Sequence, residues 1–258
     1  MKAFYGSTLR WLAILLAVPV AAQLLGGPPP PGGWTLWKAV HLLSGWTGFF
    51  LPFAVFAGGL AGGRTLPPGR FLAASGGVSL LCLFLLGYAQ PLMEDRTNRG
   101  EGEALTGTRY PTGPPTLSGL LELRARIREA PAGAMSFSTE APLRAPENWV
   151  THRIHLPLMT AVLAAVMAVL GALAGTVTSG IPPPGRLLVR WGVGLGFSAL
   201  TFLFLSAAGE WVRGDPSRSG VVGAWAPLLP PVLGIALCFV LLRRGCGATP
   251  SARDSSDG

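Results

Sequence analysis

The chain has 258 residues, of which half are hydrophobic and only 12% are charged, and its formal net charge is +8. Soluble domains usually carry about 25% charged residues, so this composition excludes an ordinary soluble domain and favours a membrane protein. A positive charge could indicate a nucleic-acid partner, but the basic residues gather at the ends of apolar segments, which excludes that interpretation.

Six long apolar segments follow one another along the chain. A helix needs about 20 apolar residues to cross a bilayer, and only helices or closed barrels satisfy their backbone in lipid. The segments lack the alternation of barrel strands. The sequence therefore predicts an all-α polytopic membrane protein with six transmembrane helices, three on each side of a short extracytoplasmic insert. The predicted spans are Leu9–Leu25, Leu36–Gly62, Phe71–Leu92, Ile154–Thr178, Leu187–Ala208 and Val221–Leu242.

Basic residues mark one side of this predicted arrangement. With six spans, one side collects Lys2, Arg10, Arg64, Arg70, Arg186, Arg190, Arg243, Arg244 and Arg253. Near the short connections of the other side lie only Lys38, Arg213 and Arg218, and the stretch from Glu94 to Arg153 carries eight acidic and eight basic residues. Cytoplasmic loops are enriched in Lys and Arg, so both termini are expected in the cytoplasm and the insert outside.

The expected organisation follows from these segments. Residues 1–92 hold transmembrane helices 1–3, residues 93–152 the periplasmic insert, residues 153–243 helices 4–6, and residues 244–258 a disordered cytoplasmic tail. Within the insert, Leu117 to Glu129 is predicted as an amphipathic helix with Leu117, Leu120, Leu121 and Ile127 on one stripe. The pattern leaves open whether this helix lies on the outer membrane surface or rests on the tops of the spans.

The first span has a second interpretation. Lys2 and Arg10, an apolar core and Val20-Ala21-Ala22 resemble a signal peptide with its cleavage site. Cleavage would leave five spans and make the three-plus-three arrangement accidental.

Glycines repeat at four-residue spacing in two predicted spans. Gly58, Gly59, Gly62 and Gly63 form two overlapping GxxxG pairs, and Gly171 and Gly175 form a third. Small residues at this spacing let helix backbones approach closely. The pairs therefore predict helix packing, either within one chain or with a second chain.

Few residues could carry chemistry. His152 and His155 have a spacing that could bind a metal, but no third ligand is evident nearby, so no metal and no cofactor is predicted. Cys82, Cys238 and Cys246 give no disulfide framework and no zinc spacing. The glycines of Trp191 to Gly196 lack the strand–turn–helix context of a dinucleotide site. No Walker motif is present, so any ATP hydrolysis must occur on another chain.

Several local patterns, in this order, resemble one membrane protein family. They are the Pro-containing stretch Leu51 to Leu60, the stretch Ala74-Ser75-Gly76-Gly77-Val78-Ser79, the short helix starting Leu117-Ser118-Gly119, Arg153 with Pro157, and Gly223-Ala224-Trp225-Ala226-Pro227. Together they make the chain similar to the LptF/LptG (YjgP/YjgQ) permeases, the membrane subunits of the ABC transporter that extracts lipopolysaccharide from the bacterial inner membrane. The resemblance covers most of the chain except residues 93–116 and the tail.

The resemblance implies a function and partners. The chain would be the permease subunit of an ABC-type exporter of a lipopolysaccharide-like glycolipid in the bacterial inner membrane, without enzyme activity of its own. It would work with a cytoplasmic ABC ATPase and a second LptF/LptG-like permease chain. Implied lipid-headgroup contacts are Lys38, Arg96, Arg153 and Arg213, and the implied ATPase-coupling loop includes Arg64, Arg70, Ser75 and Gly76. The implied lateral gate, between the first and fifth spans, includes Gly192, Gly194 and Gly196.

Two departures from the family keep other functions open. The insert has no room for the family's periplasmic β-jellyroll, which leaves open whether a separate β-jellyroll protein replaces it. The coupling Glu of the family falls at or near Pro68. A non-transporting membrane scaffold or regulatory subunit is therefore a second hypothesis. A membrane enzyme acting on lipids, with His152, His155 or Glu210 in its site, is a third.

Overall fold

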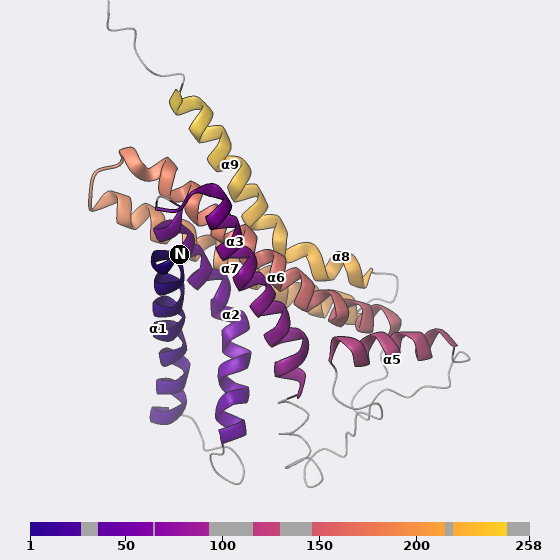
Figure 1. Ribbon diagram of the computed structural model, residues 1–258. Coiled ribbons are helices and arrows are strands. Elements are labelled where there is room, and N and C mark those ends of the chain that lie inside the picture. The colour runs from indigo at the N-terminus through magenta and orange to yellow at the C-terminus, as the bar shows by residue number, and fades with distance from the viewer. Residues whose placement is uncertain (27–35, 64, 93–115, 130–145, 215–218, 247–258) are drawn as a thin grey trace, which may run out of the picture.

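The computed structural model describes residues 1–26, 36–63, 65–92, 116–129, 146–214 and 219–246 (Figure 1). Every regular element in these residues is a helix, as the sequence predicts. Five helical segments are long and apolar enough to cross a membrane: Lys2–Gln23, Pro68–Leu92, Val150–Gly180, Gly185–Val212 and Gly220–Arg244. The central insert, residues 93–115 and 130–145, and the end of the tail, residues 247–258, lie outside the described residues.

The first half of the chain contains α1 (Lys2–Gly26), α2 (Leu36–Gly62) and α3 (Pro68–Phe84), which continues into the π-helical turn η1 (Leu85–Ala89). The second half contains α5 (Leu117–Glu129), α6 (Pro146–Val177), η2 (Thr178–Gly180), α7 (Gly185–Gly214), α8 (Gly220–Trp225), η3 (Ala226–Leu228) and α9 (Leu229–Cys246).

Two predicted boundaries need correction. The sixth predicted span is not one uninterrupted helix, because Pro227 lies in the 3₁₀ turn η3 between α8 and α9. Proline has no N–H to donate and its ring crowds the preceding turn, which breaks the α-helical ladder there. The predicted tail also starts too early, since α9 continues through Arg243 and Arg244 to Cys246.

Proline also sets the start of α3. Pro67 is the N-cap residue, with φ −58° and ψ 148°, and Pro68 opens the helix. A proline at the first helical position costs nothing, because its missing N–H would have had no partner there. The proline pair therefore fixes where α3 begins.

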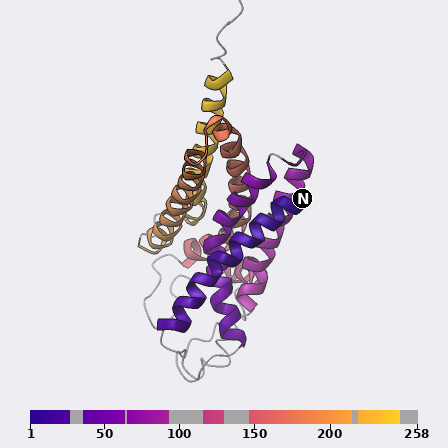
Figure 2. The same cartoon turned by 90° about the vertical axis from the view of Figure 1, so that its left-hand side faces the viewer.

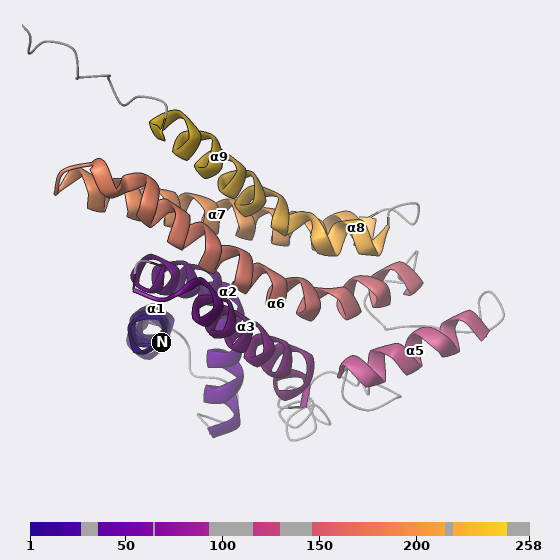
Figure 3. The same ribbon diagram turned by 45° about the horizontal axis from the view of Figure 1, so that its top comes forward.

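Helix α6 is the centre of the bundle. It packs against α2, α3, α5, α7, α8 and α9. Figure 3 shows α6 passing between α1, α2 and α3 on one side and α7 and α9 on the other. Its buried side chains include Met159, Leu163, Met167 and Leu170, which form one hydrophobic core with Phe56 of α2.

Glycines bring α2 and α6 into backbone contact. A Cβ built at Gly59 would overlap the carbonyl oxygen of Ala168, and one built at Gly171 would overlap the carbonyl oxygen of Phe56. A Cβ at Gly63 would likewise overlap Ala172. Since no side chain larger than hydrogen fits at these positions, these three glycines allow the backbones of α2 and α6 to pack directly on each other.

The other glycine pair of α2 faces a different helix. A Cβ at Gly58 would overlap the Thr8 hydroxyl oxygen, and a Cβ at Gly62 would lie 2.9 Å from Cβ of Phe4. Phe4 is fully buried there, with Phe71 of α3 edge-on at 5.8 Å between ring centroids. The two overlapping pairs therefore divide between α1 and α6, and both contacts lie within one chain.

Successive long helices run in opposite directions, and the basic and acidic residues gather at opposite ends of the bundle. Figures 1 and 2 show the N-terminus and the turn from α6 to α7 toward the same end as the last turns of α9, opposite the end of α1 and the start of α2. We call this the basic end; its described basic residues are Lys2, Arg10, Arg70, Arg186, Arg190, Arg243 and Arg244. The described carboxylates, Glu122, Glu129, Glu147 and Glu210, all lie on elements of the opposite end.

Helix α5 rests on the first turns of α6. Leu120 is buried against Val150 and Ile154, and Arg128 Nε lies 2.6 Å from Glu147 Oε1. The helix that the sequence predicts over Leu117 to Glu129 therefore packs against α6. Leu121, predicted on the apolar stripe, is half exposed, while Leu123 packs inward. Each residue turns a helix by about 100°, which carries Leu121 away from the face centred on Leu120.

We expect Gly59→Ala and Gly171→Ala each to destabilise the protein by about 1–3 kcal/mol, because the added methyl group forces α2 and α6 apart. The free energy of unfolding in mixed detergent micelles measures this. Gly192→Ala is the matched control: a Cβ there meets none of the described atoms within 4 Å. It should stabilise by about 0.5–1 kcal/mol through helix propensity. Equal effects of all three changes would contradict the backbone contact.

Candidate functional site

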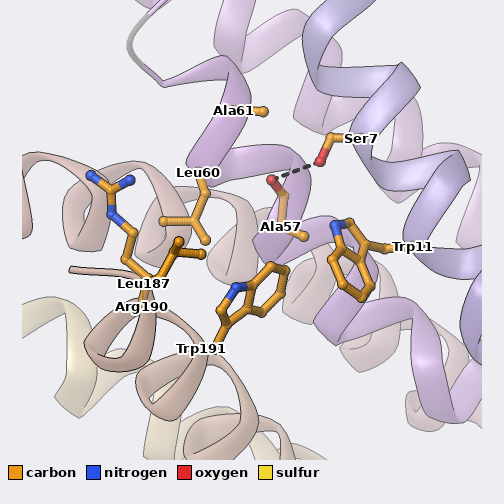
Figure 4. A pocket seen from close by; sticks show the side chains of 8 residues that line it. All are labelled: Ser7, Trp11, Ala57, Leu60, Ala61, Leu187, Arg190 and Trp191. Carbon is orange, nitrogen blue, oxygen red and sulfur yellow. Dashed lines mark hydrogen bonds between the residues drawn. The ribbon is translucent and has the colours of Figure 1, made fainter. Parts of the chain in front are cut away.

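Three helices at the basic end enclose a pocket of about 250 Å³ (Figure 4). Helix α1 contributes Ser7 and Trp11, α2 contributes Ala57, Leu60 and Ala61, and α7 contributes Leu187, Arg190 and Trp191. Leu187 at its edge is 55% exposed, so the pocket opens between α1 and α7. The lining is mainly apolar, with one guanidinium and one hydroxyl group.

Two indole rings join α1 to α7 beside this pocket. The ring centroids of Trp11 and Trp191 lie 4.4 Å apart with an interplanar angle of 57°. Phe53 of α2 contacts both, at 6.2 Å from Trp11 and 5.6 Å from Trp191. Aromatic pairs in such tilted arrangements add about 0.5–1.5 kcal/mol beyond burial. The cluster is therefore the main contact between α1 and α7 at this end.

The polar groups of the pocket form hydrogen bonds to other parts of the protein. The Ser7 hydroxyl donates to the carbonyl oxygen of Ala57 at 3.1 Å. Arg190 donates from Nε to Thr178 Oγ1 at 2.7 Å and from Nη2 to the carbonyl oxygen of Gly175 at 3.0 Å. In Figure 4 its guanidinium points away from the two indoles, toward the end of α6. A cation at the C-terminus of a helix is stabilised by the helix dipole, so Arg190 ties α7 to α6.

The three glycines implied in the lateral gate have different surroundings. Gly194 is buried, and a Cβ there would lie 2.5 Å from Cε1 of Phe56 on α2. Gly192 and Gly196 are exposed, and a Cβ at either would meet none of the described atoms within 4 Å. The contact of α1 with α7 is made by Trp11 and Trp191, which the sequence did not single out. The sequence feature that could have indicated this contact is a tryptophan directly after an arginine, at the same end of two predicted spans.

The residues implied in ATPase coupling lie at and beyond the start of α3. Arg70 is exposed in the first turn of α3, whereas Ser75 is buried and donates to the carbonyl oxygen of Leu72 at 3.0 Å. Gly76 is half-buried in the same helix, and Arg64 lies outside the described residues. The predicted loop is therefore mostly helix, and of its implied coupling residues that the structure describes, Arg70 is the exposed one.

Of the residues implied in headgroup contact, Arg153 is the one whose side chain the structure describes, and it lies away from the pocket. Arg153 is half-buried near the start of α6, at the end opposite the basic end. Lys38 in α2 and Arg213 in α7 belong to helices that reach that same end, but their side chains lie outside the described residues, as does Arg96 entirely. The described structure does not bring these four residues together with the pocket.

The two histidines near the start of α6 contact α8. His155 Nδ1 accepts a hydrogen bond from Trp225 Nε1 at 3.2 Å. His152 is buried, and a Cβ at Gly223 would lie 3.7 Å from its Nδ1. Among the described residues, no group of three His, Cys, Asp or Glu side chains could hold a metal ion. The histidines thus join α6 to α8, and Glu210 is exposed near the end of α7.

The all-helical bundle, with five helical segments long and apolar enough to cross a bilayer, has the features of an α-helical membrane protein. No family model matches the chain, and no curated protein or solved structure shows significant similarity to it.

We expect a cysteine pair, Trp11→Cys with Trp191→Cys, to be cross-linked within one chain by a short bifunctional thiol reagent. Cys82, Cys238 and Cys246 are replaced by Ala first. The cross-linked product should migrate as a compact monomer on gel electrophoresis. The control pair, Trp11→Cys with Leu25→Cys, is separated by roughly 21 Å along α1, too far for the reagent. A cross-linked dimer as the main product would place the contact between chains instead.

Proposed function

We propose that this chain is the permease subunit of an ABC-type exporter of a lipopolysaccharide-like glycolipid. It would work with a cytoplasmic ATPase and a second, LptF/LptG-like permease chain in the bacterial inner membrane. The observation that carries the proposal is the arrangement of α1 and α7. These are the helices that the resemblance assigns to a lateral gate. They contact each other through one aromatic cluster beside an open pocket.

The surfaces of α1 and α7 support a gate role. Only 11% of the apolar stretch of each helix is buried, compared with 50% for α6. Apolar side chains such as Leu188 and Leu203 of α7 and Val18 of α1 are more than half exposed. Two weakly covered helices that meet at an aromatic cluster can separate with little loss of packing, as entry of a lipid between them requires.

The proposed permease would cross the membrane six times. Helix α2 has 27 residues, and its described apolar part, Phe50–Gly62, is shorter than a full span. Its length and its place between α1 and α6 support a sixth crossing. The basic end would then face the cytoplasm, because Lys and Arg are enriched on that side. Helix α5 would lie at the periplasmic surface.

Force from an ATPase would enter at the exposed start of α3. Helix α3 packs on α6, and α6 holds α2 through the glycine contacts, so movement of α3 would reach α1 by way of packed backbones. Because the insert is too short for the family's β-jellyroll, a separate β-jellyroll protein would have to receive the lipid. By the resemblance, ATP-driven closure would shrink an outward-facing cavity and expel the lipid.

A membrane scaffold derived from such a permease is the second candidate. Pro68 stands near the position of the family's coupling Glu, and the described first turn of α3 contains no carboxylate. A scaffold would keep the fold and the partner chain without an ATPase contact. Deleting the gene would then leave lipid export unchanged.

We expect Leu25→Cys, but not Arg70→Cys, to react with a membrane-impermeant maleimide added to intact cells. Both variants carry Ala in place of the three native cysteines. Leu25 is 88% exposed at the end of α1 and Arg70 is exposed at the start of α3. The two residues lie on opposite sides of the membrane only if α2 crosses it. Arg70→Cys should react after the cells are permeabilised. Labelling of both residues in intact cells would exclude the six-span topology.

We expect a mild-detergent pull-down of the tagged chain from its native membrane to recover an ABC ATPase and a second permease chain. Arg70→Glu should lower the recovered ATPase at least about tenfold, because a reversed charge at a docking surface repels the partner. Arg126→Glu, an exposed change on α5 at the opposite end, is the matched control. Recovery of the second chain without any ATPase would favour the scaffold.

A further inference from the structure

We propose that the pocket between α1, α2 and α7 binds one anionic phospholipid from the leaflet at the basic end. The acyl-ester region of the lipid would lie against Trp11 and Trp191, and its phosphate would lie near Arg190 and Arg10. The pocket lies at the basic end, whereas Arg153, an implied headgroup contact for exported cargo, belongs to the opposite end. The lipid proposed here is a resident one rather than the cargo that would enter between α1 and α7, and its binding does not depend on transport.

The basic residues around the pocket favour an anionic ligand. Residues 1–93 contain no Asp or Glu, and none occurs from residue 148 to residue 209. All three helices around the pocket therefore approach the basic end without a carboxylate. Arg190 lines the pocket, Arg186 lies one helical turn before it, and exposed Arg10 precedes Trp11 in the chain. A phosphodiester is the anion that a membrane supplies at this depth, and basic pockets between membrane helices bind such headgroups.

The lining selects a lipid over a soluble anion. Two indoles, two leucines and two alanines form most of the wall, and they would gain nothing from free phosphate. Tryptophan favours the boundary between headgroups and hydrocarbon, where one edge of the ring is polar and the rest apolar. Drug-sized ligands occupy pockets of about 300 Å³ or more, so this one suits part of a lipid rather than a whole molecule.

The position of the opening points to the same occupant. It lies between α1 and α7, the spans with the least buried surface, and its edge carries exposed Leu187 with exposed Leu188 next to it. Leu9, on α1 between the two residues that line the pocket, is 64% exposed. A groove that opens through apolar side chains of two spans meets lipid chains directly. A second protein would have to displace those lipid acyl chains first.

The test uses the full-length chain reconstituted in vesicles with equal amounts of phosphatidylglycerol and phosphatidylcholine. The protein is re-extracted in mild detergent, and retained lipid is counted by native mass spectrometry. We expect one phosphatidylglycerol per chain, in clear excess over phosphatidylcholine. Arg190→Gln should reduce retention about tenfold, since it removes a charge-assisted contact. Equal retention of the two lipids by the wild-type chain would overturn the proposal.

A second variant separates binding from folding, because Arg190 also ties α7 to α6. Ala61→Leu fills the pocket while every arginine stays in place, and it should abolish the phosphatidylglycerol preference with an unchanged melting temperature. Ala199→Leu, the same change at an exposed position of α7 outside the pocket, should retain lipid like the wild-type chain. Wild-type retention by Ala61→Leu would overturn the assignment of the lipid to this pocket.

Discussion

The backbone contact between α2 and α6 determines where the other helices lie. Gly59 on one helix and Gly171 on the other bring main chains so close that neither position admits a methyl group. In a bilayer, apolar side chains gain little by leaving lipid, so close packing of backbones supplies the association that hydrophobic burial supplies in water. With α6 packed against most other helices, fixing α2 on it fixes the first half of the chain onto the second.

Helix α2 also positions α1. The second glycine pair of α2 is one residue out of phase with the first and therefore faces α1, where Phe4 and Thr8 fill the space. This places the first turns of α1 beside the first turns of α7 and brings Trp11 onto Trp191. The pocket is thus a consequence of the glycine spacing in α2. It lies where three helices converge at one end, and α2 contributes its floor.

The sequence predicted the helices well because each long apolar run has one stable form in lipid. The predicted first span starts at Leu9, whereas helix α1 begins at Lys2, because hydropathy marks only the apolar part of a helix that also extends through polar residues. The glycine spacing predicted close helix packing but not which helix packs there. A GxxxG pair indicates only that another backbone comes close. The pairing of Trp11 with Trp191 joins residues far apart in the chain and depends on packing that no local pattern contains.

The length of α6 has a further consequence for how the protein sits in its membrane. With 32 residues, α6 extends about 48 Å, whereas the hydrocarbon core is about 30 Å thick. The surplus must be taken up by tilt or by emergence into the headgroup layer. Val150 and Ile154, which hold α5, lie in the first turns of α6. The height of α5 relative to the lipid surface is therefore set by bilayer thickness, so that membranes of different thickness would expose this helix to different degrees.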